Sequence, residues 1–328
     1  MRHVHLHRIL ALWFAFLSGF LLAPPARASD FYVPILVYHR FAPTPQNLYT
    51  VSLQEFEAQM RYLKENGYQV IPLKTLVDFY LGKGSPPPPR AVVITIDDGH
   101  TSVYSYALPI LKKYGYPATL FIYPCCIGRV SYALTWEQIR ELADQGQDIG
   151  SHTRYHPNFK LERRRLKPQE YEELVEKEMT SSKKILEEKL GRSIRYLSYP
   201  FGVHDEVLEK KAFQAGYQAM LTIVRRGCDQ TSNRGALPRF LIEPHTSIRS
   251  FSSILSPQPS PGKLKASWRT GLPCPSVASS TCSMLLIQPS PTPPSRMARI
   301  LPIQSGSRAI SVYRFLGFQK VHPKHWAS

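Results

Sequence analysis

Two adjacent carboxylates, Asp97 and Asp98, follow the apolar residues 91–96 and precede Gly99. An apolar, β-branched run of this length is typical of a buried parallel strand, which would deliver both acids at its carboxyl end. Neighbouring strand residues point to opposite sides, so the two side chains can do different work a few ångströms apart. We interpret Asp98 as a metal ligand and Asp97 as the group that handles a proton. The alternative is a solvated turn after a strand.

A second pair of chemically useful side chains is His152 and His156, which follow a short expected strand at residues 147–151. Two imidazoles at this spacing can meet one ion on a helical turn or a tight loop. With one carboxylate they make a set that suits a divalent metal with open coordination positions. Histidine pairs are often incidental, but this pair and the two acids each follow a strand. We therefore predict Asp98, His152 and His156 as metal ligands.

The third group is Arg195 together with the turn Tyr199-Pro200-Phe201-Gly202, at the two ends of another expected strand. One interpretation is an ordinary turn with a surface arginine. In the functional interpretation, Arg195 keeps Asp97 ionised and oriented. The aromatic rings of the turn suit the apolar faces of sugars, so its four residues are candidate substrate contacts.

The elements that would position these groups alternate between strand and helix six or seven times. The helices begin with capping patterns such as Ser52-Leu53-Gln54-Glu55, and most close on a glycine before the next strand. This alternation is the signature of parallel α/β architecture, either a barrel or an open sheet. The candidate groups all follow strands, and parallel barrels place their active sites at that face. We expect a deformed parallel (β/α) barrel of about seven strands.

Both ends of the chain differ from the middle. Residues 1–28 look like an export signal, with Arg2 and Arg8 before an apolar stretch at 9–23 and Ala26-Arg27-Ala28 as a cleavage site. We therefore expect a periplasmic, secreted or cell-surface protein, an uncleaved membrane anchor being the alternative. Residues 257–328 contain eleven prolines and no Asp or Glu, a composition that packs no core. We predict a catalytic domain at 29–256 and an irregular, low-complexity or aberrant tail at 257–328.

The formal net charge of +17 is unevenly distributed along the 328 residues. The tail holds nine Lys or Arg and no acid, so it supplies +9 and leaves +8 for residues 1–256. A nucleic-acid interface needs a basic face interleaved with recognition elements, and nothing in the sequence resembles one. We therefore expect no nucleic-acid partner, and we expect the chain to act as a monomer. The five cysteines form no metal pattern, and we interpret them as structural or incidental.

Together the three groups resemble the motifs of the polysaccharide deacetylases, carbohydrate esterase family four. The family's Thr-Phe-Asp-Asp-Gly is similar to Thr95-Ile96-Asp97-Asp98-Gly99. Its His-Ser/Thr-x-x-His is similar to residues 152–156, and its arginine with an aromatic-Pro-aromatic-Gly turn to Arg195 and residues 199–202. The resemblance covers roughly residues 32–250, with Ile96 in place of the usual Phe and an unusual His100 after the glycine.

The resemblance implies a metal-dependent hydrolysis of N-acetyl groups on an N-acetylglucosamine polysaccharide, with release of acetate. The implied metal is zinc, with cobalt, nickel or iron as alternatives, held by Asp98, His152 and His156. Asp97 would be the general base, Arg195 would steady it, and the backbone N–H of Tyr199 would help to hold the oxyanion. The nearer alternatives are an O-acetyl esterase on xylan and a peptidoglycan deacetylase. A carbohydrate-binding module without turnover is the alternative from another class.

Tyr38-His39-Arg40 near the start of the chain resembles exported deacetylases that act on poly-β-1,6-N-acetylglucosamine. In those enzymes a histidine near the N-terminus is the general acid, which implies that role for His39. His245 is the competing candidate, nearer to where other family members keep their acid. For each histidine, the structural alternative is a core or capping role.

Overall fold

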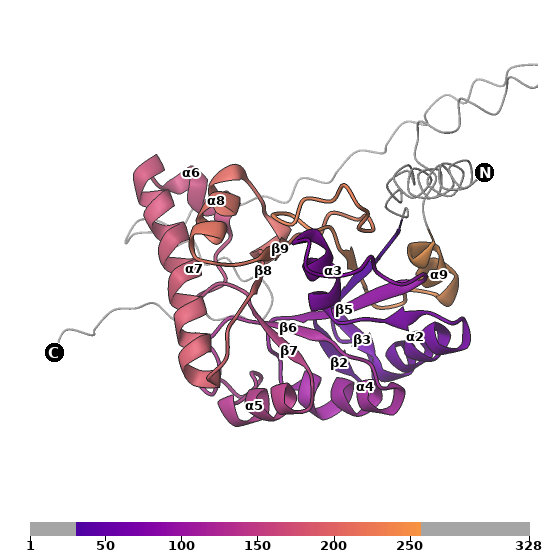
Figure 1. Ribbon diagram of the computed structural model, residues 1–328. Helices are drawn as coiled ribbons and strands as arrows, with labels where there is room; N and C mark the ends of the chain where they lie inside the picture. Colours follow the sequence, from indigo (N-terminus) through magenta and orange to yellow (C-terminus); the bar gives the residue numbers. More distant parts are fainter. Residues whose placement is uncertain (1–30, 257–328) are drawn as a thin grey trace, which may run out of the picture. The chain divides into compact units, whose positions relative to one another are not determined.

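The computed structural model describes residues 31–256 and shows a curled parallel sheet surrounded by helices (Figure 1). Seven strands follow one another in the order β10-β1-β5-β6-β7-β8-β9, and β4 pairs with β5 off this path. A separate parallel pair joins β2 and β3. The bounds are β1 (Ile35–Tyr38), β2 (Arg40–Ala42), β3 (Thr50–Ser52), β4 (Gln69–Val70), β5 (Ala91–Asp97), β6 (Thr119–Ile122), β7 (Asp148–Ser151), β8 (Tyr196–Ser198), β9 (Ala219–Leu221) and β10 (Phe240–Leu241). The deformed parallel (β/α) barrel predicted from the sequence is confirmed.

Strand β5 lies at the centre of this arrangement, and all seven of its residues are buried. It pairs in parallel with β1 on one side and with β6 on the other. A strand buried on both faces needs a continuous apolar run, which residues 91–96 supply apart from Thr95. Thr95 satisfies its own hydroxyl by donating to the carbonyl of Leu36 at 2.8 Å. Strand β5 therefore ends inside the protein, with Asp97 as its last residue.

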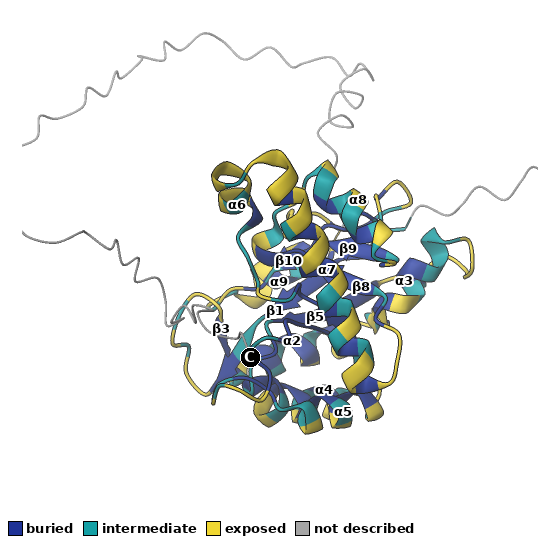
Figure 2. Cartoon of the chain, turned by 90° about the vertical axis from the view of Figure 1, so that its left-hand side faces the viewer, coloured by how far each residue is buried: buried dark blue, intermediate teal, exposed yellow. Residues whose placement is uncertain are grey.

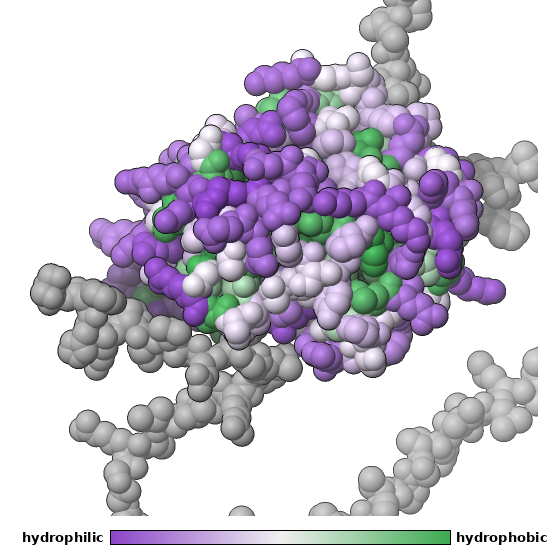
Figure 3. Space-filling model, turned by 90° about the horizontal axis from the view of Figure 1, so that it is seen from below, coloured by the Kyte–Doolittle hydropathy of each residue, from purple (hydrophilic) through white to green (hydrophobic). Residues whose placement is uncertain are grey.

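The helices cover the outside of the sheet and turn polar faces outward, so the strands form the buried centre (Figure 2). The face seen from below is mostly hydrophilic, with small separate hydrophobic areas (Figure 3). Two helices begin with the expected capping boxes, at Ser52 with Glu55 and at Thr135 with Gln138. The α-helices are α2 (Leu53–Glu65), α3 (Leu73–Tyr80), α4 (Leu108–Tyr114), α5 (Trp136–Asp144), α6 (Phe159–Arg165), α7 (Pro168–Leu190), α8 (Glu206–Gln214) and α9 (Ile248–Leu255), with a π-helical turn η1 (Val103–Ala107) and a 3-10 turn η2 (Pro200–Gly202).

The two ends of the sheet are joined by the segment that connects β9 to β10. Residues 234–239 run alongside β9 and exchange backbone hydrogen bonds with it, including Leu237 N–H to Met220 C=O and Thr222 N–H to Leu237 C=O, both at 2.8 Å. The chain then continues as β10, which pairs in parallel with β1. The segment therefore places the fully buried Arg239 between its pairing with β9 and the start of β10.

Several elements were missing from the sequence prediction. Helix α6 buries only Phe159 and carries three arginines in its last turn, so its apolar signal is weak. Helix α9 is rich in serine, which hides its buried positions, Phe251, Ile254 and Leu255. The predicted signal at 1–28 and the predicted tail at 257–328 lie outside the described residues. Within residues 31–256, no helix is both long and apolar enough to span a membrane.

Candidate metal and catalytic site

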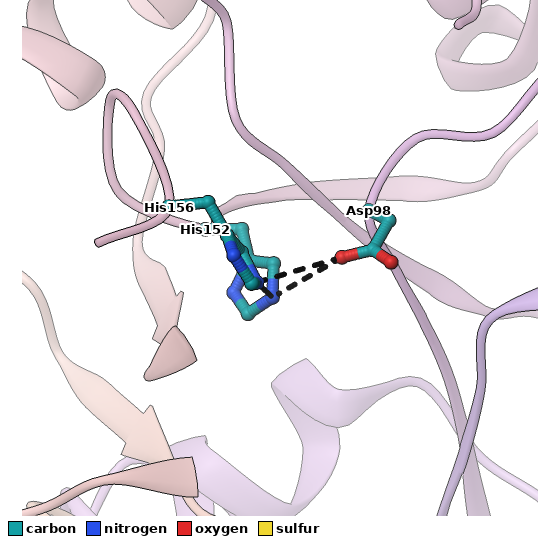
Figure 4. A group of neighbouring side chains, drawn as sticks. All are labelled: Asp98, His152 and His156. Atoms are coloured by element: carbon teal, nitrogen blue, oxygen red, sulfur yellow. Dashed lines mark hydrogen bonds and ion pairs between the residues drawn. The ribbon is translucent and has the colours of Figure 1, made fainter. Parts of the chain in front are cut away.

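Three side chains that follow β5 and β7, the strands on either side of β6, point toward one another, as Figure 4 shows for Asp98, His152 and His156. The Nε2 atoms of the two histidines lie 3.1 Å apart. Asp98 Oδ1 lies 3.6 Å from His152 Nε2 and 3.7 Å from His156 Nε2. A tetrahedral ion with bonds of about 2.0–2.1 Å separates its ligand atoms by roughly 3.3 Å. The three donor atoms therefore have the spacing that a small divalent metal requires.

The protonation of the two histidines also fits a metal. His152 Nδ1 lies 2.8 Å from the carbonyl of Ser198, which only accepts, so Nδ1 donates and Nε2 keeps its lone pair. Burial lowers the pKa of His152 to about 4, although Asp97 opposes that effect. Burial likewise lowers the pKa of His156 to about 4. Both rings are therefore neutral near pH 7, the form that binds a metal.

The backbone explains how two adjacent acids reach different places. Asp97 completes the extended strand β5, whereas Asp98 has a left-handed φ of 77° and Gly99 continues the turn with a φ of 69°. Aspartate tolerates this region better than most residues. The turn directs Asp98 toward the histidines and leaves Asp97 beneath them, with its Oδ2 3.9 Å from His152 Nε2. The two adjacent acids therefore occupy different positions, as the prediction of separate roles requires.

Asp97 is 2% exposed and is held by Arg239, which is fully buried. The guanidinium donates from Nη1 to Oδ1 at 2.9 Å and from Nη2 to Oδ2 at 2.8 Å, and Ser198 Oγ donates to Oδ2 at 2.9 Å. Burial would raise the pKa of Asp97, but the charge of Arg239 outweighs it and holds that pKa well below its usual range. Asp97 is therefore a carboxylate at all neutral pH values.

The prediction that Arg195 steadies Asp97 is wrong. Arg195 precedes β8, and its Nη2 lies 3.5 Å from Asp148 Oδ2 in a partly exposed ion pair. Ser198, at the other end of that strand, is the residue that reaches Asp97. Sequence reasoning missed Arg239, although a charged residue between Pro238 and the apolar Phe240-Leu241-Ile242 was a signal that could have found it.

The two histidines considered as general acid lie in different surroundings. His39 follows β1 and is close enough to Asp97 and His156 for its charge to lower the pKa of both. Its buried Nδ1 has no hydrogen-bond partner among the described residues. The side chain of His245 is 81% exposed. The residue lies against the first turn of α2, where its backbone N–H donates to Glu55 Oε1 at 2.8 Å. Of the two, only His39 lies near the other site residues.

The predicted substrate turn, residues 199–202, divides into a buried and an exposed part. Tyr199 cannot contact a substrate in the predicted way, because its N–H donates to the carbonyl of Leu221 at 3.0 Å and its hydroxyl to the carbonyl of Gly235 at 3.0 Å. Pro200 is also buried. Phe201, by contrast, is 53% exposed, and its ring centroid lies 4.8 Å from that of His156. Phe201 is the member of the turn that reaches the site.

Gly202 holds Phe201 in that position. Its φ is 65°, and a Cβ at this residue would lie 2.8 Å from the backbone nitrogen of Ile223. Phe201 itself has a left-handed φ of 58°, which a bulky residue adopts only when its surroundings impose it. The close approach of Gly202 to Ile223, two residues after β9, therefore favours the turn that presents the ring beside His156.

Comparison with known proteins decides which family this fold and site represent. A family model described as polysaccharide deacetylase matches residues 84–220. A protein of Bacillus subtilis (strain 168) named as a polysaccharide deacetylase, YxkH, is 35% identical over 223 residues, which are 68% of this chain and 76% of that protein. The chain belongs to the polysaccharide deacetylase family. The deacetylase is thus an enzyme, a hydrolase that acts on amide bonds.

Other relatives agree with this assignment. The poly-β-1,6-N-acetyl-D-glucosamine N-deacetylase of Staphylococcus aureus (strain MRSA252) is 28% identical over 199 residues, 59% of the deacetylase and 68% of that protein. The structure of IcaB from Ammonifex degensii matches with a TM-score of 0.60 and 26% identity, covering 69% of this chain and 98% of that one. Streptococcus pyogenes deacetylase PplD, solved with acetate, shares the fold with a TM-score of 0.62 at 23% identity, covering 70% and 100%. The resemblance seen in the sequence is confirmed.

The correction from Arg195 to Arg239 gives a test with a built-in control. We expect Arg239→Met to lower the free energy of unfolding of the deacetylase by about 3–5 kcal/mol, because it leaves the Asp97 carboxylate buried without a partner. Arg195→Met removes a half-exposed pair and should cost about 1 kcal/mol or less. Urea unfolding of the full chain measures both. Equal losses in the two variants would contradict the assignment.

Proposed function

We propose that the deacetylase removes N-acetyl groups from a polysaccharide that contains β-1,6-linked N-acetylglucosamine, in a metal-dependent hydrolysis that releases acetate. The observation that carries this proposal is the meeting of a three-residue metal set with a buried, arginine-held carboxylate at one end of the barrel. Deacetylation needs both parts, whereas a protein that only binds sugars needs neither. The similarity to the S. aureus enzyme supports the choice of polymer.

Asp98, His152 and His156 would hold the metal, and zinc suits two imidazoles and one carboxylate with open positions left for substrate. When bound, the metal polarises the acetyl carbonyl and lowers the pKa of a water molecule. Ser198 fixes the ring orientation of His152 through its carbonyl, which also raises the basicity of the ligand. The residues present therefore fit the metal that the family resemblance implies.

Asp97 would accept the proton of the attacking water. Its carboxylate is already ionised and fixed by Arg239 and Ser198, so it needs no reorganisation before the reaction. Arg239 would then stabilise the carboxylate again once the proton has moved on.

His39 would protonate the departing amine. Its buried Nδ1 has no hydrogen-bond partner among residues 31–256, so no described residue engages that nitrogen. The ring also lies tilted against that of Tyr49, with the two ring centroids 5.3 Å apart. Phe201, beside His156 and half exposed, would pack against the apolar face of a sugar ring.

We also propose that the protein acts outside the cytoplasm, where such polymers occur.

A panel of oligosaccharides tests the substrate. We expect the full chain with added zinc to release acetate from β-1,6-linked N-acetylglucosamine oligomers faster than from chitin oligomers, N-acetylated peptidoglycan fragments or acetylated xylan. The measurement is acetate released with time at equal substrate concentration. Faster release from acetylated xylan would favour the O-acetyl esterase alternative, and no release from any substrate would contradict the proposal.

Two aspartate variants separate the proposed roles of the acids. Asp98→Ala should lose bound zinc on dialysis, because it removes a ligand. Asp97→Asn should keep its zinc and lose about 10²–10⁴-fold in kcat, the range for a general base. Zinc content and acetate release are measured on the same samples, with thermal melting as the check on folding. If both variants lose metal equally, the separation of roles is wrong.

A leaving-group experiment tests His39 against His245. We expect His39→Ala to slow N-deacetylation by about 10²-fold or more, and His245→Ala to leave it unchanged. Hydrolysis of 4-nitrophenyl acetate needs no proton donor, because nitrophenolate leaves unprotonated, so His39→Ala should retain it. The acid role fails if His39→Ala slows both reactions to the same degree.

A further inference from the structure

The loop that carries the two histidine ligands has an unusual backbone. Thr153 has a φ of 63° and His156 a φ of 56°, both in the left-handed region. Threonine is branched at Cβ and enters this region only at a cost. A loop with two such residues keeps its shape only if its surroundings hold it. The groups that hold residues 153–156 therefore matter to the position of His156 relative to His152.

A buried carboxylate on α7 meets this loop from outside. Glu178 is 4% exposed, and its Oε2 accepts the backbone N–H of Arg154 at 2.9 Å and of Tyr155 at 2.8 Å. Both N–H groups belong to the chain between the two histidine ligands. Burial raises the pKa of Glu178, and these two hydrogen bonds oppose that rise. An apolar residue at this position would fill the space without burying a charge, so packing alone does not explain a glutamate here.

Ser182, one helical turn further along α7, forms a second connection. Its hydroxyl lies 2.7 Å from that of Ser151, and Ser151 Oγ accepts the N–H of Thr153 at 3.2 Å. On the opposite side, His152 N–H donates to the carbonyl of Ile122, and the carbonyl of Arg154 accepts from Cys125 N–H at 3.3 Å. The loop is therefore fixed between α7 and the end of β6, and Glu178 makes the only charge-assisted contacts among these bonds.

We propose that Glu178 is a positioning residue for the metal site, which fixes residues 153–156 so that His156 meets the same ion as His152 and Asp98. The proposal rests on the metal dependence proposed above. Glu178 touches neither ligand ring in any of its hydrogen bonds, so its effect passes through the backbone. Loss of such an outer contact typically weakens metal binding by about 10–100-fold.

Helix α7 offers a matched control. Glu187 also accepts a backbone N–H from a neighbouring loop, that of Ile194 at 3.0 Å, and pairs with Lys183. The loop that it holds leads to β8 and carries no metal ligand. Replacing Glu187 therefore removes a similar hydrogen bond from the same helix and leaves residues 153–156 untouched.

The experiment measures zinc affinity of the full chain by competition with a chromophoric chelator, and the absorption spectrum of the cobalt-substituted protein. We expect Glu178→Ala to weaken zinc binding by about 10–100-fold and to alter the cobalt spectrum. Glu187→Ala should change neither. Glu178→Gln should restore most of the affinity, because one amide oxygen can accept both N–H groups as Oε2 does. Wild-type affinity and spectrum in Glu178→Ala would overturn the proposal, whatever its melting temperature.

Two additions keep the test decisive. If Glu178→Ala does not fold, Glu178→Asp withdraws the carboxylate by one methylene and should still weaken zinc binding, and unchanged affinity there overturns the proposal equally. Amide hydrogen exchange of the metal-free chain should be faster at Arg154 and Tyr155 in the variant than in the wild type, and equal exchange would overturn the proposal. If the wild-type chain binds no zinc, the proposed metal dependence fails, while the exchange result still decides whether Glu178 holds the loop.

Discussion

The ion pair between Asp97 and Arg239 is the interaction on which the rest of the site depends. Removing two charges from water costs more than their attraction returns unless every remaining hydrogen-bonding group is satisfied. Arg239 meets this condition by also donating from Nε to the carbonyl of Thr222 at 2.8 Å, from Nη1 to Thr95 Oγ1 and from Nη2 to Ser198 Oγ. Its partners come from β5, β8 and the end of β9, so the pair closes only when the sheet has curled. The ionised, fixed state of Asp97 therefore depends on the same curling of the sheet that forms the barrel.

The ion pair also explains why two neighbouring acids behave differently. Asp97 is committed to Arg239 and Ser198 inside the barrel, whereas Asp98 leaves the strand through a left-handed turn and faces the imidazoles. If the chain continued as a regular strand, the two carboxylates would point to opposite faces of the sheet, and only one of them would face the site. The turn at Asp98 and Gly99 brings both to the same region at different depths. A metal ligand and a proton acceptor can then occupy adjacent positions in the sequence.

Local patterns in the sequence were enough to predict the barrel and to bring Asp98, His152 and His156 together, because strand ends of a parallel sheet meet on one side. Such patterns can mark Arg239 as a buried charge but cannot pair it with Asp97, since 142 residues separate the two and no spacing rule joins them. Arg195 failed for a geometric reason. It precedes β8, whereas Ser198 ends that strand, and three strand residues span roughly 10 Å. A motif residue at the wrong end of a strand cannot reach the site, whatever its charge.

Exposure indicates how a polymer would approach. Asp97 and His152 are buried, Asp98 and His156 are partly exposed, and Phe201 is the most exposed of the group. Access therefore runs past Phe201 and His156 toward the acids, not through the barrel wall. The inner and outer parts of the site are also held by different contacts. Arg239 in the core holds Asp97, whereas Glu178 on helix α7 holds the loop that carries His156. A polymer that presses on the outer half would thus act on the loop and leave the buried carboxylate where Arg239 keeps it.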